Sequence, residues 1–211
     1  MTKCILHGGY AGRVNPENDL FFREILKDTS DEVNVLLVHF ARNEDEYERF
    51  FEENTTQFKR NKENKNLSFE VASEDDFINQ VDKSDVIYLQ GGPTLKLLKV
   101  LKKYPNLEEN LKSKTVAGES AGAYVLSSCF YSKSEGGVFD GLGFVPVKTI
   151  CHYIGENKEE LDRCPHYLEK VIKSELFSAV NGLFDRGSVS GSHDRHYPSW
   201  HSYARVDRCG V

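Results

Sequence analysis

The 211-residue chain lacks any apolar run close to the roughly 20 residues that a membrane-spanning helix needs. It also lacks an excess of positive charge, because 27 Lys and Arg face 33 Asp and Glu and give a formal net charge of -6. A dedicated nucleic-acid-binding domain usually shows a basic stripe. We therefore expect neither a membrane nor a nucleic acid as a partner.

Paired cysteine motifs are absent as well. The five cysteines are irregularly spaced and form no Cys-x-x-Cys pair, which argues against a zinc ribbon and a thioredoxin-type redox site. We expect free thiols in the reducing cytoplasm, with no bound metal and no cofactor. The first seven residues have no long apolar region or cleavage site and predict a first strand rather than a signal peptide.

Short apolar runs rich in β-branched residues alternate with amphipathic stretches of helical length. The expected strands cover residues 4–6, 33–38, 67–71, 86–89, 115–117, 144–150 and 177–180, and the expected helices cover residues 16–27, 44–60, 94–103 and 158–174, with another beginning at residue 121. Runs this apolar are typical of strands buried on both faces of a parallel sheet. The alternation predicts an open α/β fold with helices on both faces. We expect one domain over residues 1–211, with residues 186–211 as an atypical C-terminal tail.

A candidate nucleophile, Ser120, lies in the run Gly118-Glu119-Ser120-Ala121-Gly122-Ala123, between an expected strand and an expected helix. This Gly-x-Ser-x-Gly spacing is typical of a sharp strand-to-helix turn that exposes the serine hydroxyl, because small neighbours let strand and helix approach closely. The helix N-terminus then directs free N–H groups at the site, and the N–H of Ala121 can donate to an oxyanion.

A second glycine turn, Gly91-Gly92, follows another expected strand. Functional sites in open α/β sheets lie beyond the carboxyl ends of the strands, so this loop and Ser120 should share one rim. Gly91 or Gly92 can supply the second oxyanion donor. Pro93 follows and has no N–H of its own.

The serine needs a general base, and a histidine of near-neutral pKa is the usual partner. His152 follows the expected strand at residues 144–150. His7 and His39 also end expected strands. The residues alone leave all three open, with His152 favoured.

The Gly-Gly loop, the Gly-x-Ser-Ala-Gly-Ala turn and the later strand-end histidine resemble the serine peptidases that include aspartyl dipeptidase (peptidase E) and cyanophycinase. The resemblance covers about residues 1–185. It implies a three-layer αβα sandwich with a mostly parallel sheet, like the class I glutamine amidotransferases. It also implies that Ser120 is the nucleophile and His152 the general base of a dipeptidase or small-peptide exopeptidase that forms an acyl-enzyme.

For the third catalytic residue, the resemblance points to Asp185, with Glu135 as the alternative. Asp185 stands where aspartyl dipeptidase has a glutamate, so its reach is shorter, and it borders a tail that does not resemble the family's final strands. Pro93 also departs from the family, whose glycine loop commonly continues with Asn.

Three other functions compete with a peptidase. A glutamine amidotransferase would carry Cys at position 120, and an α/β-hydrolase esterase would place its acid before the histidine, as Glu135 but not Asp185 does. A binding domain with a degenerate site is the non-enzymatic alternative. We expect a small peptide as the substrate and leave a homodimer open.

Overall fold

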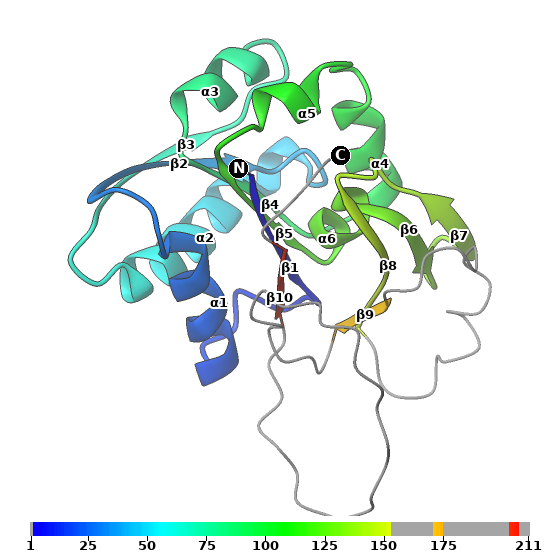
Figure 1. Cartoon of the computed structure of the whole chain (residues 1–211), viewed down its shortest axis with the longest axis horizontal. Helices are drawn as coiled ribbons and strands as arrows, with labels where there is room; N and C mark the ends of the chain where they lie inside the picture. The colour runs from blue at the N-terminus through cyan, green and yellow to red at the C-terminus, as the bar shows by residue number, and fades with distance from the viewer. Residues whose placement is uncertain (1, 153–170, 175–202, 207–211) are drawn as a thin grey trace, which may run out of the picture.

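The computed structural model of the chain describes residues 2–152, 171–174 and 203–206. Its larger sheet has six strands in the order β10-β1-β5-β4-β2-β3 (Figure 1). Their bounds are β1 Lys3–His7, β2 Glu32–Val38, β3 Asn66–Val71, β4 Val86–Leu89, β5 Thr115–Glu119 and β10 Tyr203–Val206. The five strands from β1 to β3 in this order are parallel, and β10 pairs antiparallel with β1. All the parallel strands therefore end at one rim.

Helices cover both faces of this sheet. Their bounds are α1 Pro16–Leu26, the 3-10 helix η1 Glu44–Glu46, α2 Tyr47–Asn61, α3 Phe77–Lys83, α4 Thr94–Leu101, α5 Leu107–Asn110 and α6 Ala121–Leu126. One face packs against α1 and α2, where Phe22 and Phe58 belong to the same core cluster as Ile5. The other face packs against α3 to α6, and takes Leu6 from the same strand. Because successive strand residues point to opposite faces, apolar runs without polar alternation satisfy both layers.

A smaller sheet of four strands continues the chain after α6. Its order is β7-β6-β8-β9, with bounds β6 Ser127–Ser132, β7 Gly137–Asp140, β8 Val145–Cys151 and β9 Val171–Ser174. β6 follows α6 without a break, and Tyr124 of the helix stacks on Phe130 of the strand at 4.8 Å between ring centroids. Figure 1 shows this sheet beside the end of the larger one, next to α6.

The predicted α/β sandwich with a mostly parallel sheet is confirmed. One segment prediction is wrong, because residues 171–174, expected to end a helix, form β9 parallel to β8. Residues 203–206, for which no strand was predicted, form β10. In both places the segment pairs with an available strand edge, and this pairing outweighs the local sequence pattern. Sequence periodicity cannot reveal such a distant partner. The strand expected at residues 177–180 lies outside the described residues.

The cysteines depart in part from the expected free thiols. Cys129 and Cys151 are buried and free, whereas Cys4 is disulfide-bonded. In the part of the chain that the structure describes, no helix is both long and apolar enough to cross a bilayer.

Candidate active site

Ser120 occupies the turn between β5 and α6 with φ 50° and ψ −102°, a conformation that non-glycine residues rarely adopt. Its backbone N–H donates to the carbonyl of His7 at 2.9 Å. A Cβ on Gly118 would collide with the backbone of Gly122, and one on Gly122 would collide with the carbonyl of Leu89. The glycines therefore allow the contact between strand and helix that holds the strained serine in place.

His152 directly follows β8, and its Nε2 lies 2.9 Å from the hydroxyl oxygen of Ser120. The histidine also has a positive φ, 54°, and its N–H donates to the carbonyl of Gly8 at 3.1 Å. Its ring lies edge-on to Tyr10 with centroids 4.7 Å apart, and a Cβ on Gly9 would collide with it. The loop after β1 thus forms the seat of the His152 ring.

His152 is exposed at the cleft rim, yet its contacts with this loop remove part of its water shell. This burial lowers the pKa of His152 below its usual 6.5. The imidazole is therefore neutral at pH 7 and can accept a proton from the serine hydroxyl.

The rings of the two rival histidines form their hydrogen bonds away from the hydroxyl of Ser120. His7 is buried, with its Nε2 3.0 Å from Oδ1 of Asn18, and its Nδ1 accepts from the N–H of Gly9 at 3.1 Å. His39 is buried with its Nε2 3.2 Å from Nδ2 of Asn54. Burial lowers the pKa of each to about 4. Both serve as neutral hydrogen-bonding groups of the interior.

The expected oxyanion donors lie beside the serine. A Cβ placed on Gly91 would lie 3.3 Å from the Cβ of Ser120, and Gly91 and Gly92 both line the same cleft as Ser120. Within the described part of the chain, no hydrogen bond occupies the backbone N–H of Gly91 or Ala121. These two N–H groups, one from each glycine turn, are available to an oxyanion.

Of the two candidates for the third catalytic residue, only Glu135 lies within the described residues. Asp185 lies outside the described residues. Glu135 lies exposed in the turn between β6 and β7, where its N–H donates to Oγ of Ser132 at 3.4 Å. Among residues 2–152, no carboxylate contacts the ring of His152.

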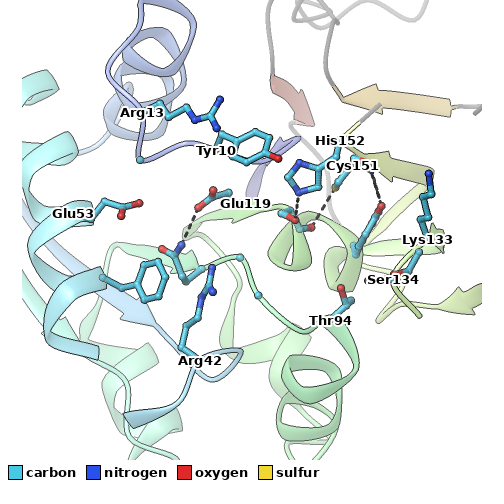
Figure 2. Close-up of a pocket in the computed structure, with 18 of the residues that line it drawn as sticks. Tyr10, Arg13, Arg42, Glu53, Thr94, Glu119, Lys133, Ser134, Cys151 and His152 are labelled. Carbon is cyan, nitrogen blue, oxygen red and sulfur yellow. Dashed lines mark hydrogen bonds between the residues drawn. The ribbon is translucent and has the colours of Figure 1, made fainter. Parts of the chain in front are cut away.

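Ser120 and His152 line a cleft of about 910 Å³. Figure 2 shows Arg42, Glu53 and Arg13 on one side and Lys133 and Ser134 on the other. The guanidinium of Arg42 lies 4.0 Å from the centroid of Phe50, and its buried Nε has no hydrogen-bond partner among the described residues. No group of three His, Cys, Asp or Glu side chains in the described segments could hold a metal ion.

The sequence reasoning did not single out Glu119, the residue before the serine. Its side chain is buried at the edge of the cleft, where Oε1 accepts from the N–H of Ala11 at 3.0 Å. Oε2 accepts from the hydroxyl of Tyr88 and from Nε2 of Gln90, both at 3.1 Å. A glutamate at the variable position of Gly-x-Ser-x-Gly, flanked by apolar and small residues, was the available signal.

Comparisons with known proteins identify relatives. Residues 5–189 match the model of peptidase family S51. A putative peptidase E protein from Listeria monocytogenes EGD-e has a TM-score of 0.57 and 22% identity, over 82% of this chain and 90% of that one. A peptidase from an acI-B1 Actinobacterium has a TM-score of 0.56 and 21% identity, over 80% of this chain and 74% of that one. No curated protein matches this chain.

Proposed function

This chain belongs to peptidase family S51 and is a serine-type peptidase, and we propose that it is a dipeptidase or small-peptide exopeptidase acting through Ser120, His152 and an acid. The observation that carries the proposal is the 2.9 Å contact between Oγ of Ser120 and Nε2 of His152 at a strained strand-to-helix turn. A nucleophile and base within hydrogen-bond reach are the signature of covalent acyl transfer.

The proposed reaction has two halves. Oγ of Ser120 attacks the scissile carbonyl while Nε2 of His152 takes its proton, and the N–H groups of Gly91 and Ala121 receive the negative charge on the carbonyl oxygen. The intermediate collapses as the imidazolium returns the proton to the leaving amine, which leaves an acyl group on Ser120. Water then attacks the ester with His152 again as the base, and the serine is restored. Asp185 is the proposed acid that orients the imidazole.

The cleft supports a short substrate. Its volume of about 910 Å³ lies near the upper end of small-molecule sites, which suits a peptide of a few residues. A short peptide brings its charged termini close to the scissile bond. The cleft offers charges of both signs for them, with Glu53 against an ammonium group and Arg13 and Arg42 against a carboxylate.

Arg42 is the strongest candidate for a carboxylate contact. Arg49 also lies over Phe50, at 4.2 Å, but its Nη2 is already paired with Glu46 at 3.0 Å. Arg42 has no ion pair within the described segments, and its guanidinium stacks on Phe50. An unpaired guanidinium at the cleft favours a substrate that carries an additional carboxylate near the scissile bond.

The proposal is tested by incubating the purified chain with a dipeptide library, and in parallel with a fluorophosphonate probe and with aryl esters. We expect cleavage of dipeptides, a preference for acidic ones, and a probe adduct on Ser120 that mass spectrometry locates. EDTA should leave the rate unchanged, because no step uses a metal.

Ser120→Ala serves as the matched control for both the probe and the library. Cleavage of aryl esters without any cleavage of peptides would instead identify an esterase. A folded wild-type protein that neither labels nor cleaves would contradict the proposed activity and favour a binding domain.

A further inference from the structure

The buried carboxylate of Glu119 joins three parts of the site that are far apart in the sequence. It extends from β5 immediately before Ser120, and it receives one hydrogen bond from the loop after β1 and one from the end of β4. Its sequence separations from these two donors, Ala11 and Gln90, are 108 and 29 residues. Figure 2 shows Glu119 between the loop that carries Tyr10 and the turn beneath the cleft.

The first of these bonds bears on the general base. Ala11 follows directly on Gly9 and Tyr10, the two residues that seat the His152 ring. The carbonyls of this loop are already fixed by the amide of Asn18, which donates to Tyr10 and Ala11 at 2.8 and 3.2 Å. The bond from the N–H of Ala11 to Glu119 ties the same loop to the strand that carries the nucleophile.

The second bond bears on the oxyanion donors. Gln90 directly precedes Gly91, and its Nε2 donates to Oε2 of Glu119 at 3.1 Å. The other end of the Gln90 amide is fixed too, because Oε1 accepts from Nδ2 of Asn54 at 2.7 Å. The orientation of the Gln90 amide is thereby set, and with it the start of the glycine turn.

Because the Glu119 carboxylate is buried, it and its donors depend on one another for their hydrogen bonds. Burial raises the pKa of Glu119, and the hydrogen bonds from Ala11 and Tyr88 oppose that rise. The three groups around the carboxylate are all donors, so both oxygens must act as acceptors. Any buried donor left without its acceptor would pull its loop toward another partner or toward water.

We propose that Glu119 is a positioning residue, whose carboxylate holds the loop after β1 and the glycine turn after β4 in register with Ser120. It does not touch the reacting atoms. It acts through the seat of the His152 ring and through the oxyanion donor Gly91. The inference rests on the proposed Ser120–His152 peptidase activity and adds a residue to its machinery.

Three variants separate positioning from the simple loss of a buried hydrogen bond. Glu119→Met keeps the size of the side chain but accepts no hydrogen bond from either loop. Tyr88→Phe is the matched control, because it removes the third donor from the same carboxylate without touching either loop. The double variant with Glu119→Gln and Gln90→Glu, the exchange pair, reverses the amide and the carboxylate. Its new amide oxygen still accepts from the N–H of Ala11, and its new carboxylate accepts from the new amide and from Asn54.

The measurements are the rate of fluorophosphonate labelling, kcat and KM on the best dipeptide, and the melting temperature. We expect Glu119→Met to label and turn over about 10–100-fold more slowly with KM within about twofold, because misplaced groups slow attack without weakening binding. Tyr88→Phe should stay within about twofold of wild type, and the exchange pair within about threefold, whatever their melting temperatures.

Several outcomes would overturn the inference. A folded Glu119→Met protein that labels as fast as wild type would do so, as would an exchange pair as slow as Glu119→Met. If Glu119→Met does not fold, Glu119→Gln alone is compared with the exchange pair: faster labelling of the pair supports the inference and equal rates reject it. A wild-type protein that fails to label rejects the proposed activity itself, whereas a labelled wild type with unaffected variants rejects only the role of Glu119.

Discussion

The larger and the smaller sheet contribute to the site in different ways. β4 and β5 of the larger sheet end in glycine turns whose shapes are fixed by close contacts, as between Gly118 and Gly122. β8 of the smaller sheet supplies His152, whose ring is seated by Gly9 and Tyr10 from the other sheet. The proposed nucleophile and oxyanion donors are therefore positioned by local contacts, while the proposed base is positioned by contacts between the two sheets.

The largest expected effect lies on the larger sheet. Ser120→Ala removes the attacking oxygen, so we expect kcat to fall by about 10⁴-fold or more, because loss of a triad nucleophile leaves only binding and the oxyanion donors. The melting temperature should change little, since the hydroxyl faces an open cleft. Dipeptide hydrolysis and circular dichroism measure the two. Turnover close to wild type would exclude Ser120 as the nucleophile.

The next prediction asks which carboxylate His152 needs in addition to the loop that seats its ring. We expect Asp185→Asn to lower kcat by about 10²–10⁴-fold, because the carboxylate orients the imidazole and stabilises the imidazolium. Glu135→Gln should stay within about twofold, since Glu135 lies exposed in the β6–β7 turn. The measured kcat values of the two variants decide between Asp185 and Glu135. If Glu135→Gln is the crippled variant, the order of the triad is Ser120, Glu135, His152.

The seat of His152 can be disturbed without touching the histidine itself. Gly9 and Gly136 both have positive φ, 122° and 75°, so alanine strains the backbone at either position. Only at Gly9 does the new Cβ meet the His152 ring, because the space around Gly136 is open. We expect kcat/KM to fall about 10–100-fold in Gly9→Ala and to stay near wild type in Gly136→Ala. Equal losses in the two variants would show that the effect is strain alone.

The two arginines stacked on Phe50 should differ in their effect on binding. Arg42→Met removes the guanidinium with the unpartnered Nε, and we expect KM for acidic dipeptides to rise about tenfold, the usual cost of one charged hydrogen bond. Arg49→Met breaks a surface pair with Glu46 and should have a smaller effect. Neutral dipeptides are the control substrates. A larger rise in KM for Arg49→Met would reassign the carboxylate contact.

The smallest effect concerns pH. Partial burial lowers the pKa of His152 below 6.5, so its neutral, competent form persists to lower pH than in a fully solvated histidine. As pH falls from 7.5 to 6.5, kcat/KM should therefore drop by less than about twofold, and the steeper loss should come below pH 6.5. A pH–rate profile from 5 to 8 checks this. A half-maximal rate above pH 7 would mean that a neighbouring carboxylate, such as the proposed Asp185, outweighs burial and raises the pKa of His152.

Those parts of the fold that are determined by residues close together in the sequence could be predicted from it. The apolar runs of β1 to β5 and the glycine spacing around Ser120 are local features, and both predict the observed elements. The residue at which α6 ends is not determined by its neighbours in the sequence. Nothing in the residues after Leu126 breaks a helix, yet Ser127 begins a strand because β8 offers an edge to pair with. β9 was missed for the same reason.

The site divides in the same way. The placement of Ser120 and Gly91 at one rim follows from parallel strands. The choice among His7, His39 and His152 does not, because all three end strands and only packing shows which ring faces the serine. Glu119 was missed because its partners, at sequence separations of 108, 31 and 29 residues, leave no trace near it in the chain.

The order of elements around the site also shapes how the enzyme could be divided into two pieces. Ser120 and His152 lie on one continuous stretch, from β5 through α6, β6 and β7 to the end of β8. Gly91 and the seat at Gly9 and Tyr10 lie earlier in the chain. A cut in the turn before β5, where Lys112 is exposed, would place the reacting pair on one fragment and its supports on the other. Neither fragment would hold a complete catalyst, so recovered hydrolysis would report that the two had reassembled.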